Sequence, residues 1–339
     1  MADGFPRLLG DIGGTNARWA WQTARGAPLQ NYSEYRCAQF ESVHAVIERY
    51  LADQHLPAPV DAAFGIATPV TGDVVQMTNH SWTFSVQDLK HALNLKRCLV
   101  LNDFAAVAAS LPTLTASDVR QIGGGTAVAG APMAVHGAPM AVLGPGTGLG
   151  VGSVVFAPQG GPVVVDGEGG HVSLAPTSAR ESAVLDCLQK RFGHASAERA
   201  VSGPGLVNLY RAICAIDGQL AASLQPAQVS AHALPDDQSE RHAACKEAVH
   251  LFAAFLGSVA GDLALTLGAR GGVYIGGGIV PRWGLAFDKL PFRERFEAKG
   301  RFRSYLKRIP TFVITAPAPA LYGAANALDA FNAAHSVVD

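Results

Sequence analysis

Two glycine-rich segments carry the residue types that bind phosphate. Residues 8–20, LLGDIGGTNARWA, set an aspartate and a glycine pair between two apolar runs, and residues 144–152, GPGTGLGVG, follow another apolar run. Glycine lets the backbone approach an anion closely and aim several amides at it. Each segment is typical of a β-hairpin whose turn could hold a phosphate, with Thr15 or Thr147 adding a hydroxyl. Asp11 could hold a phosphate-bound magnesium, directly or through water, because Mg²⁺ prefers oxygen ligands.

Neither segment fits a P-loop or a dinucleotide fingerprint. A P-loop needs a lysine after its last glycine, and residues 8–20 contain none. A dinucleotide-binding turn needs Gly-x-Gly-x-x-Gly at the start of a helix, whereas the spacing here is Gly10-x-x-Gly13-Gly14 with alternating residues after it. Two interpretations stay open: a pair of tight turns, or a duplicated phosphate-binding hairpin. The shared order of apolar run, Gly-Thr turn and apolar run favours the duplication.

An Asn-Asp pair, Asn102-Asp103, stands between the apolar run 98–101 and a helical pattern over 104–111. Asparagine and aspartate are preferred caps at the start of a helix, so a structural cap is one interpretation. The end of a strand in an α/β domain is also where ligands usually bind. A carboxylate there could accept the proton of a hydroxyl that attacks a phosphoryl group.

A third group consists of Glu168 and His171, three residues apart around two glycines, and of Glu198 further along the chain. One glutamate and one histidine without another ligand nearby make a weak zinc site. Both can hydrogen-bond a polyhydroxylated ligand, because carboxylates accept and imidazole donates or accepts. The simpler alternatives are a structural histidine and a solvated Glu198 paired with a neighbouring arginine.

The composition limits the fold and the partners. With 339 residues, 49% of them hydrophobic, the chain is expected to form about two globular domains with sizeable cores. Its formal net charge of −1 gives no reason to expect nucleic acid or an anionic membrane as a partner. The five cysteines form neither a zinc spacing nor a disulfide framework, which is typical of a reduced cytoplasm.

Three further segments bear on targeting, membrane insertion and partner binding. The start, MADGFPR, has no apolar leader segment. The apolar stretch 251–267, interrupted by Gly261 and Asp262, is too short and too mixed for a membrane span and is expected to be a core helix. The basic run 293–308 is expected to be a solvated helix face or a subunit contact.

The remaining pattern predicts strands and helices in alternation. Short buried strands are expected at residues 62–67, 98–101, 139–143, 153–156, 273–275 and 312–314. Helices are expected at residues 43–51, 104–111, 181–192, 205–216, 240–267 and 320–331. Pro112 and the turn-rich stretch after it place a domain boundary near residue 113.

Seven motifs, taken together and in order, resemble those of the bacterial glucokinases of the non-ROK group. They are GDIGGTNAR, MTNHSW, LNDF, GPGTGLG, GEGGH, SAERAVSGPGLVNLYRA and GGVYIGGGIVPR, and the likeness runs from Leu8 to about Pro281. This family belongs to the actin-like ATPase and sugar kinase superfamily. The resemblance implies an α/β fold with two RNase H-like domains and an active-site cleft between them. The small domain would be residues 1–113 and the large one 114–339, with a C-terminal helix able to pack back on the small domain.

The resemblance also implies a reaction and its site residues. ATP, bound with Mg²⁺, would transfer its γ-phosphoryl group to the 6-hydroxyl of D-glucose, with Asp103 as the general base. The sugar would be bound by Asn102, Asp103, Glu168, His171, Glu198 and Asn79, with His80 next to the last of these. ATP would be bound by Gly10, Asp11, Ile12, Gly13, Gly14, Thr15, Gly144, Gly146, Thr147, Gly148, Gly276, Gly277 and Gly278. Asp11 would lie near Mg²⁺, with a water between them.

ROK kinases carry a cysteine-rich zinc motif soon after a similar Glu-x-x-His. Here no cysteine follows His171 until Cys187, so neither ROK membership nor bound zinc is expected. A cytoplasmic homodimer without a nucleic-acid or membrane partner is expected. Two alternatives stay open: a silent sugar-sensing regulator and a sugar-independent ATPase of the same fold. The regulator would be expected to carry a DNA-binding extension, and only seven residues precede the first expected strand.

Overall fold

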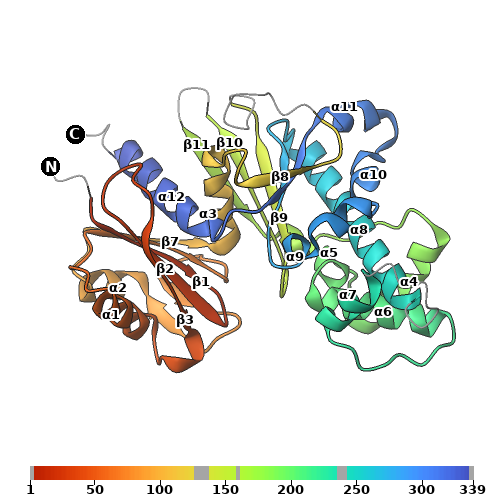
Figure 1. Ribbon diagram of the computed structural model, residues 1–339, viewed down its shortest axis with the longest axis horizontal. Helices are drawn as coiled ribbons and strands as arrows, with labels where there is room; N and C mark the ends of the chain where they lie inside the picture. The colour runs from red at the N-terminus through yellow and green to blue at the C-terminus, as the bar shows by residue number, and fades with distance from the viewer. Residues whose placement is uncertain (1–3, 126–136, 158–160, 235–242, 336–339) are drawn as a thin grey trace. The chain divides into compact units, whose positions relative to one another are not determined.

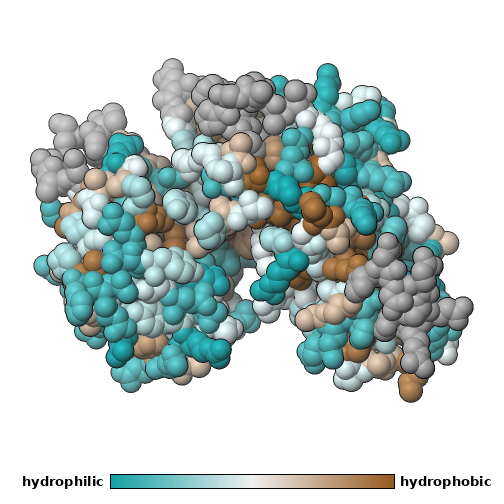
Figure 2. All heavy atoms as spheres, in the orientation of Figure 1, coloured by the Kyte–Doolittle hydropathy of each residue, from teal (hydrophilic) through white to brown (hydrophobic). Residues whose placement is uncertain are grey.

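The computed structural model describes residues 4–125, 137–157, 161–234 and 243–335. The chain forms two compact units of mixed α/β structure (Figure 1). The first unit comprises Met1–Leu114, Ser153–Asp166 and Ala316–Asp339, and the second comprises Thr115–Gly152 and Gly167–Thr315. Hydrophilic residues cover much of the visible face, as expected where the apolar residues fill internal cores (Figure 2).

The first unit is built on a five-stranded sheet of order β3-β2-β1-β4-β7 (Figure 1). β1, β2 and β3 pair antiparallel, whereas β1, β4 and β7 pair in parallel. The bounds are β1 (Arg7–Ile12), β2 (Asn16–Gln22), β3 (Gln30–Arg36), β4 (Asp61–Ile66) and β7 (Arg97–Asn102), with a separate pair β5 (Val74–Gln76) and β6 (Thr83–Ser85). The hairpin predicted around Gly13-Gly14 is confirmed as the connection between β1 and β2.

Side chains that alternate along β1 enter two different apolar clusters. Leu8 packs in a cluster with Trp19 and Phe64, to which α1 and α2 contribute. Leu9 packs in another cluster with Ala63 and residues of α12. The helices are α1 (Val43–Asp53), α2 (Val86–Ala92), α3 (Asp103–Ser110) and α12 (Pro319–His335), with 3-10 turns η1 (Cys37–Gln39) and η2 (Leu111–Thr113). Helices on both faces therefore bury the sheet.

α12 crosses α3 at a glycine. A Cβ on Gly323 would lie 1.6 Å from the carbonyl oxygen of Ala106, so a larger residue would push the helices apart. Nearby, the Nδ2 of Asn326 donates to the carbonyl of Ala109 at 2.9 Å. Because α3 begins at Asp103, this crossing helps to fix the helix that carries the expected general base.

A second sheet has six strands in the order β11-β10-β9-β12-β13-β8, of which β8, β9, β12 and β13 lie wholly in the second unit (Figure 1). β12 pairs in parallel with β9 and β13, and β8 pairs antiparallel with β13. The bounds are β8 (Val119–Ile122), β9 (Met140–Pro145), β10 (Leu149–Phe156), β11 (Pro162–Gly167), β12 (Val273–Ile275) and β13 (Thr311–Ile314). A three-residue turn joins β9 to β10, which makes these neighbours antiparallel. The order from β11 to β13 repeats that of the first sheet, as the duplication would require.

The second unit has a core formed around one long helix, α8. Its helices are α4 (Ala179–Phe192), α5 (Ala197–Ala200), α6 (Gly203–Ile216), α7 (Pro226–Ala233), α8 (Ala243–Leu267), α9 (Val280–Trp283), α10 (Phe292–Glu297) and α11 (Arg303–Arg308), with 3-10 turns η3 (Gly169–His171), η5 (Gly284–Lys289) and η6 (Gly300–Phe302). α8 has 25 residues and is apolar enough to cross a membrane by length and composition, so the expectation that the segment is too short was wrong. However, 78% of its most apolar window is buried, which confirms a core helix. The expected start at residue 240 lies outside the described residues.

The basic run after α8 is internal only in its first part, and its later residues Arg301, Arg303, Lys307 and Arg308 are exposed. The Arg293 side chain is 12% exposed and donates to Glu297 and to the carbonyl of Ile309. Arg295 binds Glu181 and the hydroxyl of Ser258. The expectation of a solvated face is therefore wrong for Arg293 and Arg295, because protein acceptors surround their guanidinium groups, and those of Arg295 come from the distant helices α4 and α8.

Candidate functional site

Three parallel strands of the first unit end at the same edge of the sheet. Ile12 of β1 lies opposite Ile66 of β4, which lies opposite Asn102 of β7. The residues that follow are the first glycine turn, the segment after β4 and Asp103. Because the carboxyl ends of parallel strands are where α/β sheets bind ligands, this edge is the candidate site of the first unit.

The first glycine turn is held by its own backbone and by two neighbours. Gly13 N–H donates to the carbonyl of Asn16 at 2.9 Å, and Cys37 N–H donates to the carbonyl of Thr15 at 2.9 Å. A Cβ on Gly14 would lie 2.8 Å from the Cβ of Asn79. The structure therefore brings Asn79, from the MTNHSW motif, against the turn that carries the expected phosphate ligands.

His80 lies in the same motif and has an incomplete set of hydrogen bonds. Its ring packs against Trp82 with ring centroids 4.6 Å apart. Its Nδ1 is buried and has no hydrogen-bond partner among the described residues. A polar atom in this condition is costly unless a ligand or water satisfies it, which agrees with a position near a polar ligand.

Asp11 ends β1 and is paired with a cation. Arg18 Nη1 lies 3.1 Å from Asp11 Oδ2, and the Asp11 side chain is 16% exposed. Burial raises the pKa of Asp11, and the charge of Arg18 acts against this rise. The described residues contain no cluster of three or more metal-ligating side chains. A single carboxylate suits Mg²⁺ that keeps most of its waters and binds phosphate oxygens.

Asn102 caps the helix that Asp103 begins. Asn102 Oδ1 accepts from the N–H groups of Phe104 at 2.8 Å and of Ala105 at 3.3 Å, so the cap interpretation is confirmed. Its Nδ2 donates to the carbonyl of Thr68 at 3.4 Å. Asp103 Oδ1 accepts from Phe104 N–H at 2.9 Å. The cap and the strand end together fix where the Asp103 carboxylate lies.

The two glycine segments of the second unit meet at the ends of β9 and β12. Gly276 N–H donates to the carbonyl of Leu143 at 2.9 Å. Gly277 has a φ of +74°, and a Cβ there would lie 2.5 Å from the carbonyl oxygen of Pro145. Residues 276–278 therefore lie directly against the start of the segment 144–148, as residues that bind one ligand would need to.

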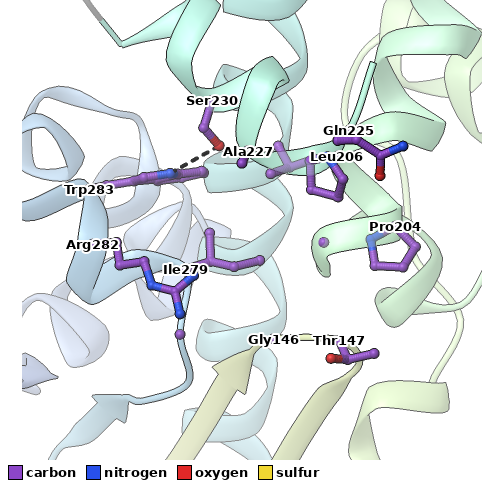
Figure 3. A pocket seen from close by; sticks show the side chains of 13 residues that line it. Gly146, Thr147, Pro204, Leu206, Gln225, Ala227, Ser230, Ile279, Arg282 and Trp283 are labelled. Carbon is purple, nitrogen blue, oxygen red and sulfur yellow. Dashed lines mark hydrogen bonds between the residues drawn. The ribbon is translucent and has the colours of Figure 1, made fainter. Parts of the chain in front are cut away.

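A cavity of about 740 Å³ opens on both glycine segments (Figure 3). Gly146 and Thr147 line one side, and Ser230 of α7 and Trp283 of α9 line another, with Trp283 Nε1 donating to Ser230 Oγ at 3.2 Å. The other lining residues are Gly203, Pro204, Leu206, Gln225, Pro226, Ala227, Gly278, Ile279 and Arg282. Its mostly apolar wall beside backbone amides is typical of a pocket for a flat organic group attached to phosphates.

The α7 side of this cavity was not predicted from the sequence. No motif distinguishes Gln225 or Ser230, and only the folding of α7 beside the glycine turn brings them to the site. Arg282 could have been predicted as a lining residue, because it follows Gly278, which is expected to bind ATP, by about one helical turn.

The expected sugar ligands of the second unit lie on two paired segments. Glu168 precedes the 3-10 turn η3 and His171 ends it, with 3.9 Å between Glu168 Oε2 and His171 Nε2. Both side chains are more than half exposed, at 59% and 61%. Ala197 N–H donates to the carbonyl of Val172 at 2.8 Å, which places α5 beside this segment.

Glu198 of α5 contacts the second glycine turn. Its Oε2 accepts from Leu149 N–H at 2.9 Å, so the alternative of a solvated side chain paired with an arginine does not describe it. The structure therefore joins three of the predicted features within the second unit: η3, Glu198 and the turn before β10.

Comparison with known proteins identifies relatives along nearly the whole chain. A family model described as Glucokinase matches residues 8–331. A relative named Glucokinase, from Aromatoleum aromaticum, is 50% identical over 329 residues, or 97% of this chain and 96% of the relative. The crystal structure of a glucokinase from an Antarctic psychrotroph is 37% identical with a TM-score of 0.84, over 96% of this chain and 98% of that one.

A more distant structure shares the fold alone. A ROK family glucokinase from Streptomyces griseus, solved with glucose and AMPPNP, is 17% identical with a TM-score of 0.62, over 95% of this chain and 99% of that one. The mixed α/β chain thus has the fold of glucokinases and ROK sugar kinases, the actin-like ATPase fold.

Proposed function

The chain belongs to the glucokinase family, and we propose that it transfers the γ-phosphoryl group of MgATP to the 6-hydroxyl of D-glucose, giving glucose 6-phosphate and ADP. The observation that supports this most is the cavity that opens on residues 146–147 and 278–279. Its volume of about 740 Å³ suits a nucleoside, and the adjoining glycine turns offer backbone amides for the phosphates.

Each unit contributes its own residues to the proposed reaction, and we propose that the units are the two RNase H-like domains of this fold. The first unit supplies Asp103 as the base that takes the proton of the 6-hydroxyl. The O6–Pγ bond forms as the bond from Pγ to the bridging oxygen of ADP breaks. Asn102 holds the start of α3, so the base stays at the end of β7.

The second unit supplies three further sugar ligands and the nucleotide pocket. Glu168, His171 and Glu198 present carboxylate and imidazole groups that hydrogen-bond sugar hydroxyls. A sugar that lacks one hydroxyl would leave one of them unpaired, which gives selectivity. Galactose carries its 4-hydroxyl on the opposite face of the ring, would leave the partner of that hydroxyl unpaired in the same way, and is expected to be a poor substrate.

The negatively charged phosphates of ATP are bound by the two glycine turns. Gly10 to Thr15 of the first unit and Gly144 to Gly148 of the second present amides to the phosphates. Mg²⁺, when bound, would supply positive charge to the transferring phosphoryl group, and Asp11 would hold it through water.

The decisive experiment measures ADP release from MgATP with and without glucose. Glucose-dependent ADP release with equal formation of glucose 6-phosphate is the expected result. ADP release at the same rate without glucose would support the sugar-independent ATPase instead. Glucose binding without any ADP release would support the silent sugar-sensing protein.

The proposed setting is a reduced cytoplasm, and the proposed assembly is a homodimer. All five cysteines are free, and burial raises the pKa of the Cys98 thiol to about 12, which keeps it protonated and unreactive. Light scattering that gives the mass of one chain would contradict the homodimer.

A further inference from the structure

The backbone of Leu149 is held on both sides by segments that carry proposed sugar ligands. Its N–H donates to Glu198 Oε2 at 2.9 Å. On its carbonyl side lies Gly170, where a Cβ would be 2.1 Å from the Leu149 oxygen. Leu149 is 4% exposed and directly follows the turn at residues 146–148. One buried residue therefore links η3 and α5 to the turn that is proposed to bind phosphate.

The glycine at position 148 is explained by the carboxylate next to it. A Cβ on Gly148 would lie 2.4 Å from Glu198 Oε2 and 3.3 Å from Glu198 Cδ. Gly146, in the same turn, has open space around the position of a Cβ. Neither residue has a φ in the left-handed region, so backbone conformation alone does not require glycine at either position. The close approach of Glu198 is therefore specific to residue 148.

Glu198 is fixed at its backbone as well as at its carboxylate. Ala197 N–H donates to the carbonyl of Val172 at 2.8 Å, which joins α5 to the segment after η3. Gly203 N–H donates to the carbonyl of Gly146 at 2.8 Å, so the start of α6 holds the other end of the turn. Because the Glu198 backbone is anchored, a change in the orientation of its side chain must alter the hydrogen bond from Leu149 N–H.

We infer that Glu198 is a positioning residue for the second glycine turn as well as a sugar ligand, and that it couples the binding of glucose to the binding of nucleotide. The inference rests on the proposed function. A sugar hydroxyl that hydrogen-bonds the carboxylate fixes its orientation, and the same orientation keeps Leu149 N–H and the turn in place for phosphate. Such coupling is reciprocal, so nucleotide must strengthen glucose binding by the same factor.

The test is a calorimetric measurement of the coupling factor. The Kd of glucose is measured with and without saturating Mg-AMPPNP, and the Kd of Mg-AMPPNP with and without saturating glucose. The wild type is expected to show a factor within the usual range of about 5 to 150. Gly148→Ala pushes the carboxylate away without removing a sugar ligand, and its factor should fall at least about threefold below the wild-type value.

Two further variants separate this role from a general weakening of the site. Gly146→Ala, the matched control in the same turn, should keep the wild-type factor even where it lowers nucleotide affinity. Glu198→Gln should weaken glucose binding but keep the factor, because its amide oxygen still accepts from Leu149 N–H. In Glu198→Asp the side chain is one methylene shorter and its carboxylate cannot reach Leu149 N–H, so the coupling factor should fall to about 1. This variant replaces Gly148→Ala in the test if Gly148→Ala does not fold.

The failures of the two proposals are distinguishable. A wild-type factor near 1, or an unchanged factor in Gly148→Ala and Glu198→Asp, would overturn the coupling role while glucose-dependent ADP release stands. Absence of glucose binding in the wild type would overturn the proposed function, and the coupling role with it.

Discussion

Arg18 lies directly opposite Asp11 in the antiparallel pair β1 and β2, with 3.1 Å between Arg18 Nη1 and Asp11 Oδ2. Glu34 lies opposite Arg18 in the next pair, with 2.7 Å between Arg18 Nε and Glu34 Oε2. The three side chains form a row of alternating charge across the sheet, an arrangement that stabilises neighbouring strands. Arg18 thereby holds the Asp11 carboxylate beside the first glycine turn.

Arg18→Met should weaken the use of MgATP more than the use of glucose. The variant removes a charge-assisted hydrogen bond to Asp11, and because Arg18 is 37% exposed the loss is reduced by solvent screening. A rise of about fivefold in the KM for MgATP, or about 1 kcal/mol, is expected. Steady-state kinetics with each substrate varied in turn would measure it.

Arg49→Met is the control for Arg18→Met. Arg49 pairs with Asp53 on α1, and its side chain is 62% exposed. Its removal should leave both KM values unchanged. An unaltered KM for MgATP in Arg18→Met would mean that Asp11 does not depend on this partner.

Asp103→Asn should remove most of kcat while glucose still binds with an affinity of the same order. A general base contributes about 10²- to 10⁴-fold, and an amide cannot take up the proton. The amide oxygen can still accept from Phe104 N–H, so the start of α3 is preserved. Rapid-quench measurement of glucose 6-phosphate and calorimetry with glucose would test the two parts. Turnover within about threefold of the wild type would place the base elsewhere.

Local sequence was sufficient for the parts of the site that local backbone geometry determines. The hairpin around Gly13-Gly14 and the cap at Asn102 depend on neighbouring residues, and both predictions are confirmed. Membership of the family is confirmed by the comparisons. The roles of the site residues stay predictions until they are tested.

Features that depend on distant segments could not be predicted in the same way. The α7 side of the cavity has no local signal, because Ser230 reaches it only when α7 packs near α9. The Arg295 part of the basic run was misjudged for the same reason: Arg295 finds its acceptor at Glu181, 114 residues away. Spacing along the chain describes one helix face but not the partner that will cover it.

Ala227→Trp should raise the KM for ATP without changing the affinity for glucose alone. Ala227 lines the cavity from α7, and an indole there would occupy the space proposed for the nucleoside. A tenfold increase in KM, or about 1.4 kcal/mol, is the minimum expected. Ala231→Trp, at an exposed position of the same helix that does not line the cavity, is the matched control. Equal KM values for the two variants would move the nucleoside to another site.

A buried ion pair joins three helices of the second unit. Glu181 of α4 and Arg295 of α10 are 5% and 14% exposed, and Arg295 also donates to Ser258 of α8 at 2.9 Å. Burial acts to raise the pKa of Glu181, but hydrogen bonds from Arg295 and Thr177 outweigh it and lower the pKa below its ordinary value. The ionised form is therefore the one that the folded state prefers.

Glu181→Gln should destabilise the protein in a pH-dependent way. Because the pKa is lower in the folded state, ionised Glu181 contributes stability above the unfolded-state pKa of about 4.3, and this is lost as pH falls through the folded-state pKa. At neutral pH the variant should lose about 3 kcal/mol of unfolding free energy, since the buried Arg295 charge loses its partner. The difference from the wild type should shrink below about pH 4.3 in urea titrations.

Glu48→Gln, at an exposed pair with His44, should differ from the wild type by less than about 0.5 kcal/mol. A Glu181→Gln difference that stays constant down to about pH 3 would show that packing, not charge, gives this contact its strength.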